Sequence, residues 1–181
     1  MAEPTRRLFF ALWPDAPTRS ALDSAALAIA GKRVRRIPAA NLHVTLAFAG
    51  SVDAVVQSCL ETGAQAIQLP GFELCIDVSG HFARPRIQWL GLSHTPAALW
   101  ELAGALRKAL AGCGLEPEAR AFHAHVSIAR KVSRPLPARP FEPVCWSIGA
   151  FSLVESVSSA AGVQYLPIRT WKLEGQAAFM G

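Results

Sequence analysis

The feature that most restricts the fold of this chain is a four-residue pattern that occurs twice, as His43-Val44-Thr45-Leu46 and as His125-Val126-Ser127-Ile128. Side chains two positions apart in a β-strand point to the same face of a sheet. Each histidine would then share a face with a hydroxyl, while the aliphatic pair faces the core. The two histidines are 82 positions apart and lie in opposite halves of the 181 residues, as a duplicated half-domain requires. The repetition predicts two strands that bring two imidazoles and two hydroxyls into one cleft.

This combination of side chains suits acid–base chemistry on a phosphate. The ordinary imidazole pKa of about 6.5 lets one ring be neutral and another protonated near neutral pH. Hydroxyl groups can donate hydrogen bonds to phosphate oxygens. A single copy would be weak evidence, since a histidine beside threonine on a strand is more often a hydrogen-bonded wall residue. We interpret His123, two positions before His125, as a flank or wall residue.

The composition predicts a globular protein whose partner is an anion. Hydrophobic residues make up 51% of the chain and charged residues 17%, so we expect residues 1–181 to form a single domain of two packed lobes. No apolar run approaches the ~20 residues of a membrane span. The first residues lack the pattern of a signal peptide, so we expect a cytoplasmic protein. We also expect it to be a monomer. The net charge of +5 favours RNA as a partner, and the densest basic cluster lies just before the first motif: Lys32, Arg33, Arg35 and Arg36.

The four cysteines, Cys59, Cys75, Cys113 and Cys145, contain no close pair. Their spacing is typical neither of a zinc site nor of a disulfide framework. We therefore expect them to act as small buried hydrophobic residues in a reducing compartment.

Hydrophobic periodicity and turn residues predict an α+β fold. Helices are expected at 15–30, between 51 and 70, and between 95 and 114. Strands are expected at about 7–13, 41–48, 72–78, 86–92, 124–129, 144–154 and 164–173, with 72–78 and 86–92 paired. We expect two antiparallel-rich sheets that face each other, with helices on the outside and the motif strands lining a central cleft.

The two motifs and several flanking stretches resemble the two-histidine (2H) phosphoesterase superfamily. The closest resemblance is to its RNA 2′,3′-cyclic phosphodiesterase group, the LigT/ThpR-like 2′-5′ RNA ligases. The flanking stretches are 7–12, 41–42, 47–50, 84–91 and 153–156. The resemblance implies a bilobed LigT-like fold with pseudo-two-fold symmetry and no metal or other cofactor. It also implies that the partners are RNA or nucleotides with 2′,3′-cyclic phosphate ends.

The resemblance implies an enzyme that hydrolyses these cyclic ends to 2′-phosphates and allows reversible 2′-5′ RNA ligation. His43 is expected to be the proton donor to the leaving 3′-oxygen, and His125 the proton acceptor that activates water. Thr45 and Ser127 are expected to bind the phosphate oxygens. Ser127 departs from the more usual threonine and loses the methyl group that stiffens χ1, so we expect a looser contact there.

Two side chains near the motifs are harder to place from the pattern. The family pattern favours Arg130 as a further phosphate ligand, but strict alternation puts it on the face opposite His125. Arg130 would have to reach around a strand end or past a bulge. Phe48 resembles a family aromatic that could meet a base, but alternation groups it with Val44 in the core. We expect the tryptophans and Tyr165 to be core residues too.

Two other classes of function are considered. A non-catalytic RNA-binding module could use the same basic cleft, but binding alone needs only basic and aromatic groups and no pair of histidines. A metal hydrolase could use the histidines as ligands. Neither motif offers a nearby Asp, Glu or Cys to complete the coordination shell, which argues against a metal.

Overall fold

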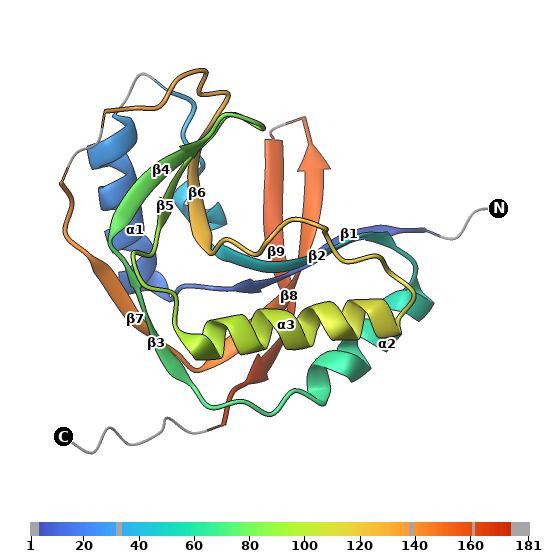
Figure 1. The fold of residues 1–181 in the computed structure, drawn as a ribbon. Helices are drawn as coiled ribbons and strands as arrows, with labels where there is room; N and C mark the ends of the chain where they lie inside the picture. The colour runs from blue at the N-terminus through green and yellow to red at the C-terminus, as the bar shows by residue number, and fades with distance from the viewer. Residues whose placement is uncertain (1–3, 32–33, 138–139, 161, 175–181) are drawn as a thin grey trace, which may run out of the picture.

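The computed structural model describes residues 4–31, 34–137, 140–160 and 162–174. Seven strands form an antiparallel sheet in the order β4-β5-β6-β2-β1-β8-β9, and β3 and β7 form a two-stranded sheet (Figure 1). The helices are α1 (Ala16–Ala30), α2 (Ala54–Gln65) and α3 (Ala97–Gly112). The strands are β1 (Arg6–Leu12), β2 (Val44–Val52), β3 (Phe72–Ile76), β4 (Val78–Phe82), β5 (Ile87–Gly91), β6 (His125–Arg130), β7 (Val144–Ile148), β8 (Ala150–Ser159) and β9 (Gly162–Lys172). The predicted α+β class with antiparallel strands in two sheets is confirmed.

The helix ends follow ordinary capping chemistry. The Asp15 carboxylate accepts a hydrogen bond from the Thr18 amide at 2.9 Å and begins α1, and Gly31 follows its last residue with a positive φ of 62°. The helix expected between 51 and 70 begins later than Ser51, which still belongs to β2. Asp53 is the cap instead, and it accepts from the Val56 amide at 2.8 Å.

Each half of the chain contains the same strand–helix–strand unit. In the first unit β1, α1 and β2 follow one another, and in the second β5, α3 and β6 do so. In both units the motif strand pairs antiparallel with the strand that precedes the helix. The two motif strands then join each other through the pair Val44–Val126 at the centre of the sheet. They therefore lie side by side in one sheet instead of in two sheets that face each other.

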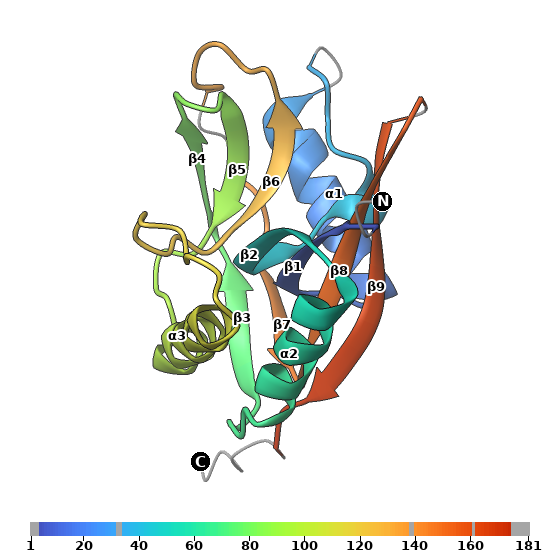
Figure 2. The same ribbon diagram turned by 90° about the vertical axis from the view of Figure 1, so that its right-hand side faces the viewer.

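The main core lies on the face of the large sheet that points away from the motif histidines. Aliphatic residues of the two motif strands lie in this core, together with residues of all three helices and of the β3–β7 sheet. Full burial of one such leucine or valine stabilises the fold by roughly 1.5–3 kcal/mol. Figures 1 and 2 show α2 and α3 at the end of the molecule opposite the tips of β6 and the β8–β9 hairpin. Within the described ranges, no helix has the length and apolar character to cross a membrane.

Some strand partners differ from the prediction. We expected β3 to pair with β5, but β3 pairs with β7, and β5 pairs with β4. The predicted strand at 144–154 is divided at Gly149 into β7 and β8, which belong to different sheets. Alternation of apolar residues shows that a segment is a strand, but it does not show which strand lies beside it.

The prediction that the cysteines are isolated hydrophobic residues is wrong. Cys75 and Cys145 lie opposite each other in the β3–β7 sheet with Cα atoms 4.0 Å apart, and they form a disulfide. Cys59 on α2 forms a second disulfide with Cys113, which follows α3, and their Cα atoms are 5.8 Å apart. Cys75 and Cys145 are 70 residues apart in sequence, and Cys59 and Cys113 are 54 residues apart. Only the tertiary fold brings the Cα atoms of each pair to the distance that a disulfide requires.

Candidate active site

The pairing of β2 with β6 relates the two motifs to each other. Val44 lies opposite Val126 in this antiparallel pair, and such a pair has a local two-fold axis at its centre. The axis superimposes residues at equal steps along the two strands, so His43 corresponds to His125 and Thr45 to Ser127. Side chains in this diagonal relation have Cβ atoms roughly 7–8 Å apart. The two imidazoles therefore flank a space that suits a phosphate group.

The His43 ring is oriented by two hydrogen bonds. Its Nδ1 lies 2.7 Å from the carbonyl oxygen of Asn41, and its Nε2 lies 2.9 Å from the Thr45 hydroxyl. Because a carbonyl oxygen only accepts, Nδ1 carries the proton, and in the neutral ring Nε2 accepts from Thr45. Asn41 is itself buried and donates to the carbonyl of Val163 on β9 at 2.8 Å. This bond ties the first motif to the β8–β9 hairpin.

The His125 ring is oriented in the same way. Its Nδ1 donates to the carbonyl oxygen of His123 at 2.7 Å. Within the described part of the chain, neither the Nε2 of His125 nor the Ser127 hydroxyl has a hydrogen-bond partner. The symmetry of the motifs is therefore broken at this hydroxyl, since Thr45 bonds to its histidine and Ser127 does not. A serine lacks the methyl group that would restrict the rotamer.

Burial lowers the pKa of both histidines. The pKa of His43 falls from 6.5 to about 4, because burial disfavours the charged ring and the charges of His125 and Arg130 act in the same direction. The hydrogen bond to Asn41 opposes this shift. Burial, together with the nearby His123, also lowers the pKa of His125. Both rings are therefore predominantly neutral at pH 7 in the unliganded protein. The Nε2 lone pair of His125 is open among the described residues, whereas that of His43 is occupied by the Thr45 hydroxyl.

A β-bulge in β6 places Arg130 on the same face as His125. Ser127 and Ala129 lie opposite consecutive residues of β5, so Ile128 is an extra residue in the pairing. Ile128 and Ala129 are both buried, and the alternation reverses after them. The bulge thus resolves the conflict between strict alternation and the family pattern.

Tyr165 of β9 holds the guanidinium of Arg130 near the first histidine. The guanidinium donates a hydrogen bond to the Tyr165 hydroxyl at 3.0 Å, and the Tyr165 ring meets His43 edge-on with the ring centroids 5.1 Å apart. Trp13 stacks on His43 with the centroids 5.6 Å apart. We expected Trp13 and Tyr165 to be core residues, but they form the wall around His43.

The same bulge occurs in β2 and corrects the prediction for Phe48. Thr45 and Ala47 lie opposite consecutive residues of β1, so Leu46 is the extra residue. Phe48 therefore turns to the histidine face, where it is 48% exposed. The prediction that Phe48 is a core residue is wrong. Phe48 occupies the position in β2 that Arg130 occupies in β6.

Aromatic residues also surround the second histidine. Phe82 meets His125 edge-on with the centroids 5.0 Å apart, and His123 meets Trp89 at 4.8 Å. The Trp89 indole leaves no room for a Cβ atom at Gly80, the residue opposite it on β4. The position of His123 agrees with its interpretation as a flank residue. We missed Phe82 and Gly80, although a glycine among strand residues can indicate close packing of a ring.

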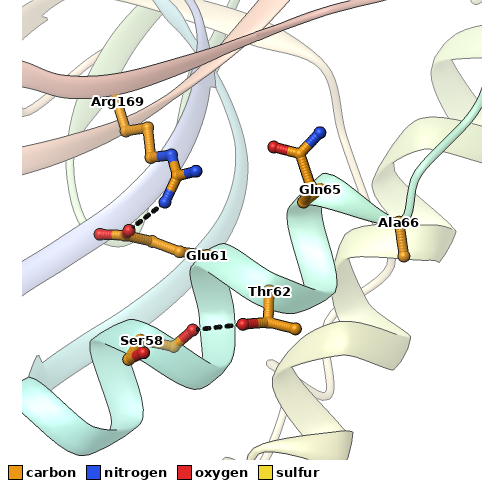
Figure 3. Close-up of a pocket in the computed structure, with 6 residues that line it drawn as sticks. All are labelled: Ser58, Glu61, Thr62, Gln65, Ala66 and Arg169. Atoms are coloured by element: carbon orange, nitrogen blue, oxygen red, sulfur yellow. Dashed lines mark hydrogen bonds and ion pairs between the residues drawn. The ribbon is translucent and has the colours of Figure 1, made fainter.

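A cavity of about 460 Å³ adjoins this cluster. It shares Asn41, Arg130 and Tyr165 with the surroundings of the histidines, and none of the described residues that line it is acidic. A second cavity, of about 320 Å³, lies between α2 and β9 and contains no motif residue (Figure 3). Glu61 and Arg169 form an ion pair at its edge. No residue of either motif lines the first cavity, but that cavity adjoins the motifs through Asn41 and Arg130.

The donor set around the histidines does not suit a metal. Within the described ranges, no group of three or more His, Cys, Asp or Glu side chains could hold a metal ion. The polar groups beside the two imidazoles are hydroxyls, a guanidinium and backbone carbonyls. The hydroxyls and the guanidinium can donate to an anion, and the carbonyls already accept the Nδ1 protons of the histidines.

Known proteins are similar to this chain over most of its length. The family model of the 2'-5' RNA ligase superfamily matches residues 14–159. An Escherichia coli (strain K12) protein named RNA 2',3'-cyclic phosphodiesterase is 35% identical over 176 residues, which cover 96% of this chain and 99% of the relative. A protein of the same name from Aeropyrum pernix is 30% identical over 116 residues, covering 62% of this chain and 66% of that protein.

A solved structure has the same fold. The crystal structure of E. coli LigT complexed with 3'-AMP has a TM-score of 0.88 and 32% identity, and the match covers 94% of this chain and 99% of the LigT chain. The expected resemblance to RNA 2′,3′-cyclic phosphodiesterases and the expected LigT-like fold are confirmed. This chain belongs to the 2'-5' RNA ligase superfamily.

Proposed function

We propose that this chain is an enzyme that hydrolyses the 2′,3′-cyclic phosphate at an RNA end and leaves a 2′-phosphate. The observation that carries the proposal is the pair of Nε2 atoms. Each imidazole donates its Nδ1 proton to a carbonyl two residues earlier, which directs its Nε2 away from the backbone. The two-fold relation of the paired motif strands supports an arrangement with these two Nε2 atoms on either side of one phosphate.

The proposed reaction needs one base and one acid. The Nε2 of His125 takes a proton from water, and the water oxygen forms a bond to phosphorus. The bond between phosphorus and the 3′-oxygen breaks, and the Nε2 of a protonated His43 gives its proton to that oxygen. The anionic phosphate raises the pKa of His43 when it binds, which supplies this protonated form. A 5′-hydroxyl in place of water would give a 2′-5′ linkage by the same proton transfers.

The other site residues stabilise charge on the phosphate. The hydroxyls of Thr45 and Ser127 donate to the non-bridging oxygens, where negative charge increases in the transition state. Arg130 neutralises part of that charge, and Tyr165 positions it through the 3.0 Å hydrogen bond. Phe48, half-exposed on the same face, offers a surface on which the terminal base can stack.

The names of the relatives support this substrate class. The E. coli relative is named RNA 2',3'-cyclic phosphodiesterase, and solved LigT structures are complexed with 3'-AMP and with phosphate. We further propose that the chain works as one two-histidine domain, residues 1–181, and as a cytoplasmic monomer. Cell fractionation tests the compartment, which is needed because the structure pairs all four cysteines and disulfides are rare in cytosolic proteins. Sedimentation of the purified protein tests the monomer.

Turnover of adenosine 2′,3′-cyclic phosphate tests the proposal, with the product identified by chromatography. We expect adenosine 2′-phosphate, and a loss of roughly 10²–10⁴-fold in kcat for His43→Ala and for His125→Ala. His94→Ala is the matched control, because His94 is exposed on a loop outside both motifs. Binding of RNA without turnover would instead favour the non-catalytic module. A 3′-phosphate product would contradict the proposed leaving oxygen.

A further inference from the structure

The cavity of about 460 Å³ meets the surroundings of the histidines at Asn41, Arg130 and Tyr165, and the rest of its rim is basic. Besides Arg130, three basic residues line it: Arg35 and Arg36 from the segment before the first motif, and Lys131 after β6. Ile87 and Val163 contribute apolar surface. We call this part of the cavity the basic groove.

Two of these cations have no counter-charge among the described residues. Arg36 forms an ion pair with Asp23, and Arg130 donates to Tyr165. Arg35 and Lys131 are exposed, and neither has a side-chain hydrogen bond or an ion pair with another described residue. None of the described residues that line the groove is acidic, so Arg35 and Lys131 add positive potential that no charge in this lining offsets.

Backbone hydrogen bonds fix Arg35 relative to the catalytic cluster. The Arg130 amide donates to the Arg35 carbonyl at 3.1 Å, and the Ile37 amide donates to the Ile128 carbonyl at 2.8 Å. Residues 35–37 thus run beside the bulged end of β6. The side chain of Arg35 therefore starts from a backbone position that is set by the same strand that carries His125 and Arg130.

Lys131 is held in an uncommon backbone conformation. Its φ is 61°. Arg86, the residue just before β5, lies next to the Ile87–Arg130 pair and has a φ of 65°. The Val132 amide donates to the Arg86 carbonyl at 3.0 Å and closes this end of the strand pair. Left-handed backbone at a residue other than glycine is unfavourable and is concentrated at functional sites. Here it turns the chain at the rim of the groove, where Lys131 lines the cavity.

We propose that the basic groove binds the phosphodiester that immediately precedes the terminal nucleotide, with Arg35 and Lys131 contacting that phosphate. The inference rests on the proposed function, since the terminal cyclic phosphate must lie between the histidines. The groove shares Arg130 with that site and continues away from it with unpaired cations, as a bound polyanion requires. Ile87 and Val163 then lie beside the sugar and base of the preceding nucleotide. The enzyme on this account favours oligonucleotides over cyclic mononucleotides.

The test compares three substrates that end in the same cyclic phosphate. They are adenosine 2′,3′-cyclic phosphate, the dinucleotide that carries it at its 3′ end, and the same dinucleotide with an uncharged methylphosphonate linkage. We expect the wild-type protein to have a higher kcat/KM for the charged dinucleotide than for the other two. Arg35→Gln and Lys131→Gln should each reduce this preference about threefold to fivefold, as for an exposed ion pair. The double variant should also reduce the salt slope of dinucleotide binding by about 0.7, the contribution of one neutralised single-strand phosphate.

Lys108→Gln is the matched control, because Lys108 is an exposed residue of α3 at the other end of the molecule (Figure 1). It removes the same charge and should leave the preference unchanged. Equal kcat/KM for the charged and methylphosphonate dinucleotides would overturn the inference and leave the proposed function in place. A preference that survives in the Arg35 and Lys131 variants would overturn it too. Absence of hydrolysis of all three substrates would instead contradict the proposed function.

Discussion

The two histidines differ in what occupies their Nε2 atoms. The lone pair of His43 Nε2 accepts from Thr45, whereas that of His125 has no partner within the described residues. An open lone pair is ready to accept a proton from water, which supports His125 as the base. The two-fold relation alone makes the motifs interchangeable, so this difference gives the role assignment its structural support.

A leaving group that needs no proton separates the two roles. A substrate with an activated 3′ leaving group should largely rescue His43→Ala, because only the acid becomes unnecessary. His125→Ala should stay inactive, since water still needs a base. The ratio of kcat/KM for the activated and natural substrates measures the rescue. Rescue of His125→Ala alone would reverse the assignment.

The pH dependence follows from the lowered pKa values. The proposed reaction needs one ring protonated and one neutral, and in the unliganded protein burial lowers the pKa of His43 to about 4 and lowers the pKa of His125 from 6.5. Above both pKa values the proton is lost, so we expect kcat/KM to peak below pH 6.5 and to fall as the pH rises. Bound phosphate raises both pKa values, so kcat should peak at a higher pH. Coincident profiles of the two constants would contradict this prediction.

At the scale of single elements, the bulges explain where prediction from sequence succeeded and where it failed. Alternation correctly placed His43 with Thr45 and His125 with Ser127, because no bulge separates them. It placed Phe48 wrongly and left Arg130 unresolved, because one extra residue reverses the parity of all that follow. A signal was present, since an alanine follows the last residue of each motif and makes two consecutive aliphatic residues, Leu46-Ala47 and Ile128-Ala129.

The position of Arg130 after the β6 bulge predicts a loss of activity when its side chain is removed. Because Arg130 lies on the histidine face, Arg130→Ala should reduce kcat/KM at least tenfold, on the order of 1.4 kcal/mol of transition-state stabilisation. Arg130→Lys should restore only part of it, because lysine lacks the planar fork. Steady-state kinetics measure both, with exposed Arg120→Ala as the control. An Arg130→Ala variant with wild-type kinetics would show that the guanidinium does not act on the phosphate.

The disulfide between Cys59 and Cys113 connects the ends of a long loop that includes α2 and α3. Opening it should lower the free energy of unfolding by roughly 2–4 kcal/mol, because the unfolded chain regains entropy. Denaturant titration of the double variant Cys59→Ser, Cys113→Ser measures the loss. The kcat of this variant should match the wild type, because neither cysteine is near the histidines in the described contacts. An unchanged midpoint would mean that the bond does not stabilise the fold.

At the scale of the whole molecule, the order of elements was predictable and the partners of several strands were not. The repeated motif predicted two related halves, and the two strand–helix–strand units are those halves. The β3–β7 pairing and the two disulfides join segments that are distant in sequence, and only the packed molecule decides them. Local patterns carry no information on such contacts.

Metal independence is a property of the whole donor set. Two imidazoles without a carboxylate or thiolate make a poor site for a divalent cation. We therefore expect a chelator to leave hydrolysis of a cyclic nucleotide unchanged, in an assay with protein dialysed against it. Loss of activity that a single divalent metal restores would contradict the two-imidazole mechanism.

The local two-fold axis between Val44 and Val126 has a consequence for the orientation of a bound substrate. A perfectly symmetric site would hold a nucleotide in two opposite directions with equal free energy, and only one of them would put the leaving oxygen beside the acid. Phe48 and Arg130 occupy equivalent positions and have opposite chemistry, an aromatic ring on one side and a permanent cation on the other. Their difference removes the degeneracy, so the two halves of a repeated structure define a head and a tail for the molecule bound between them.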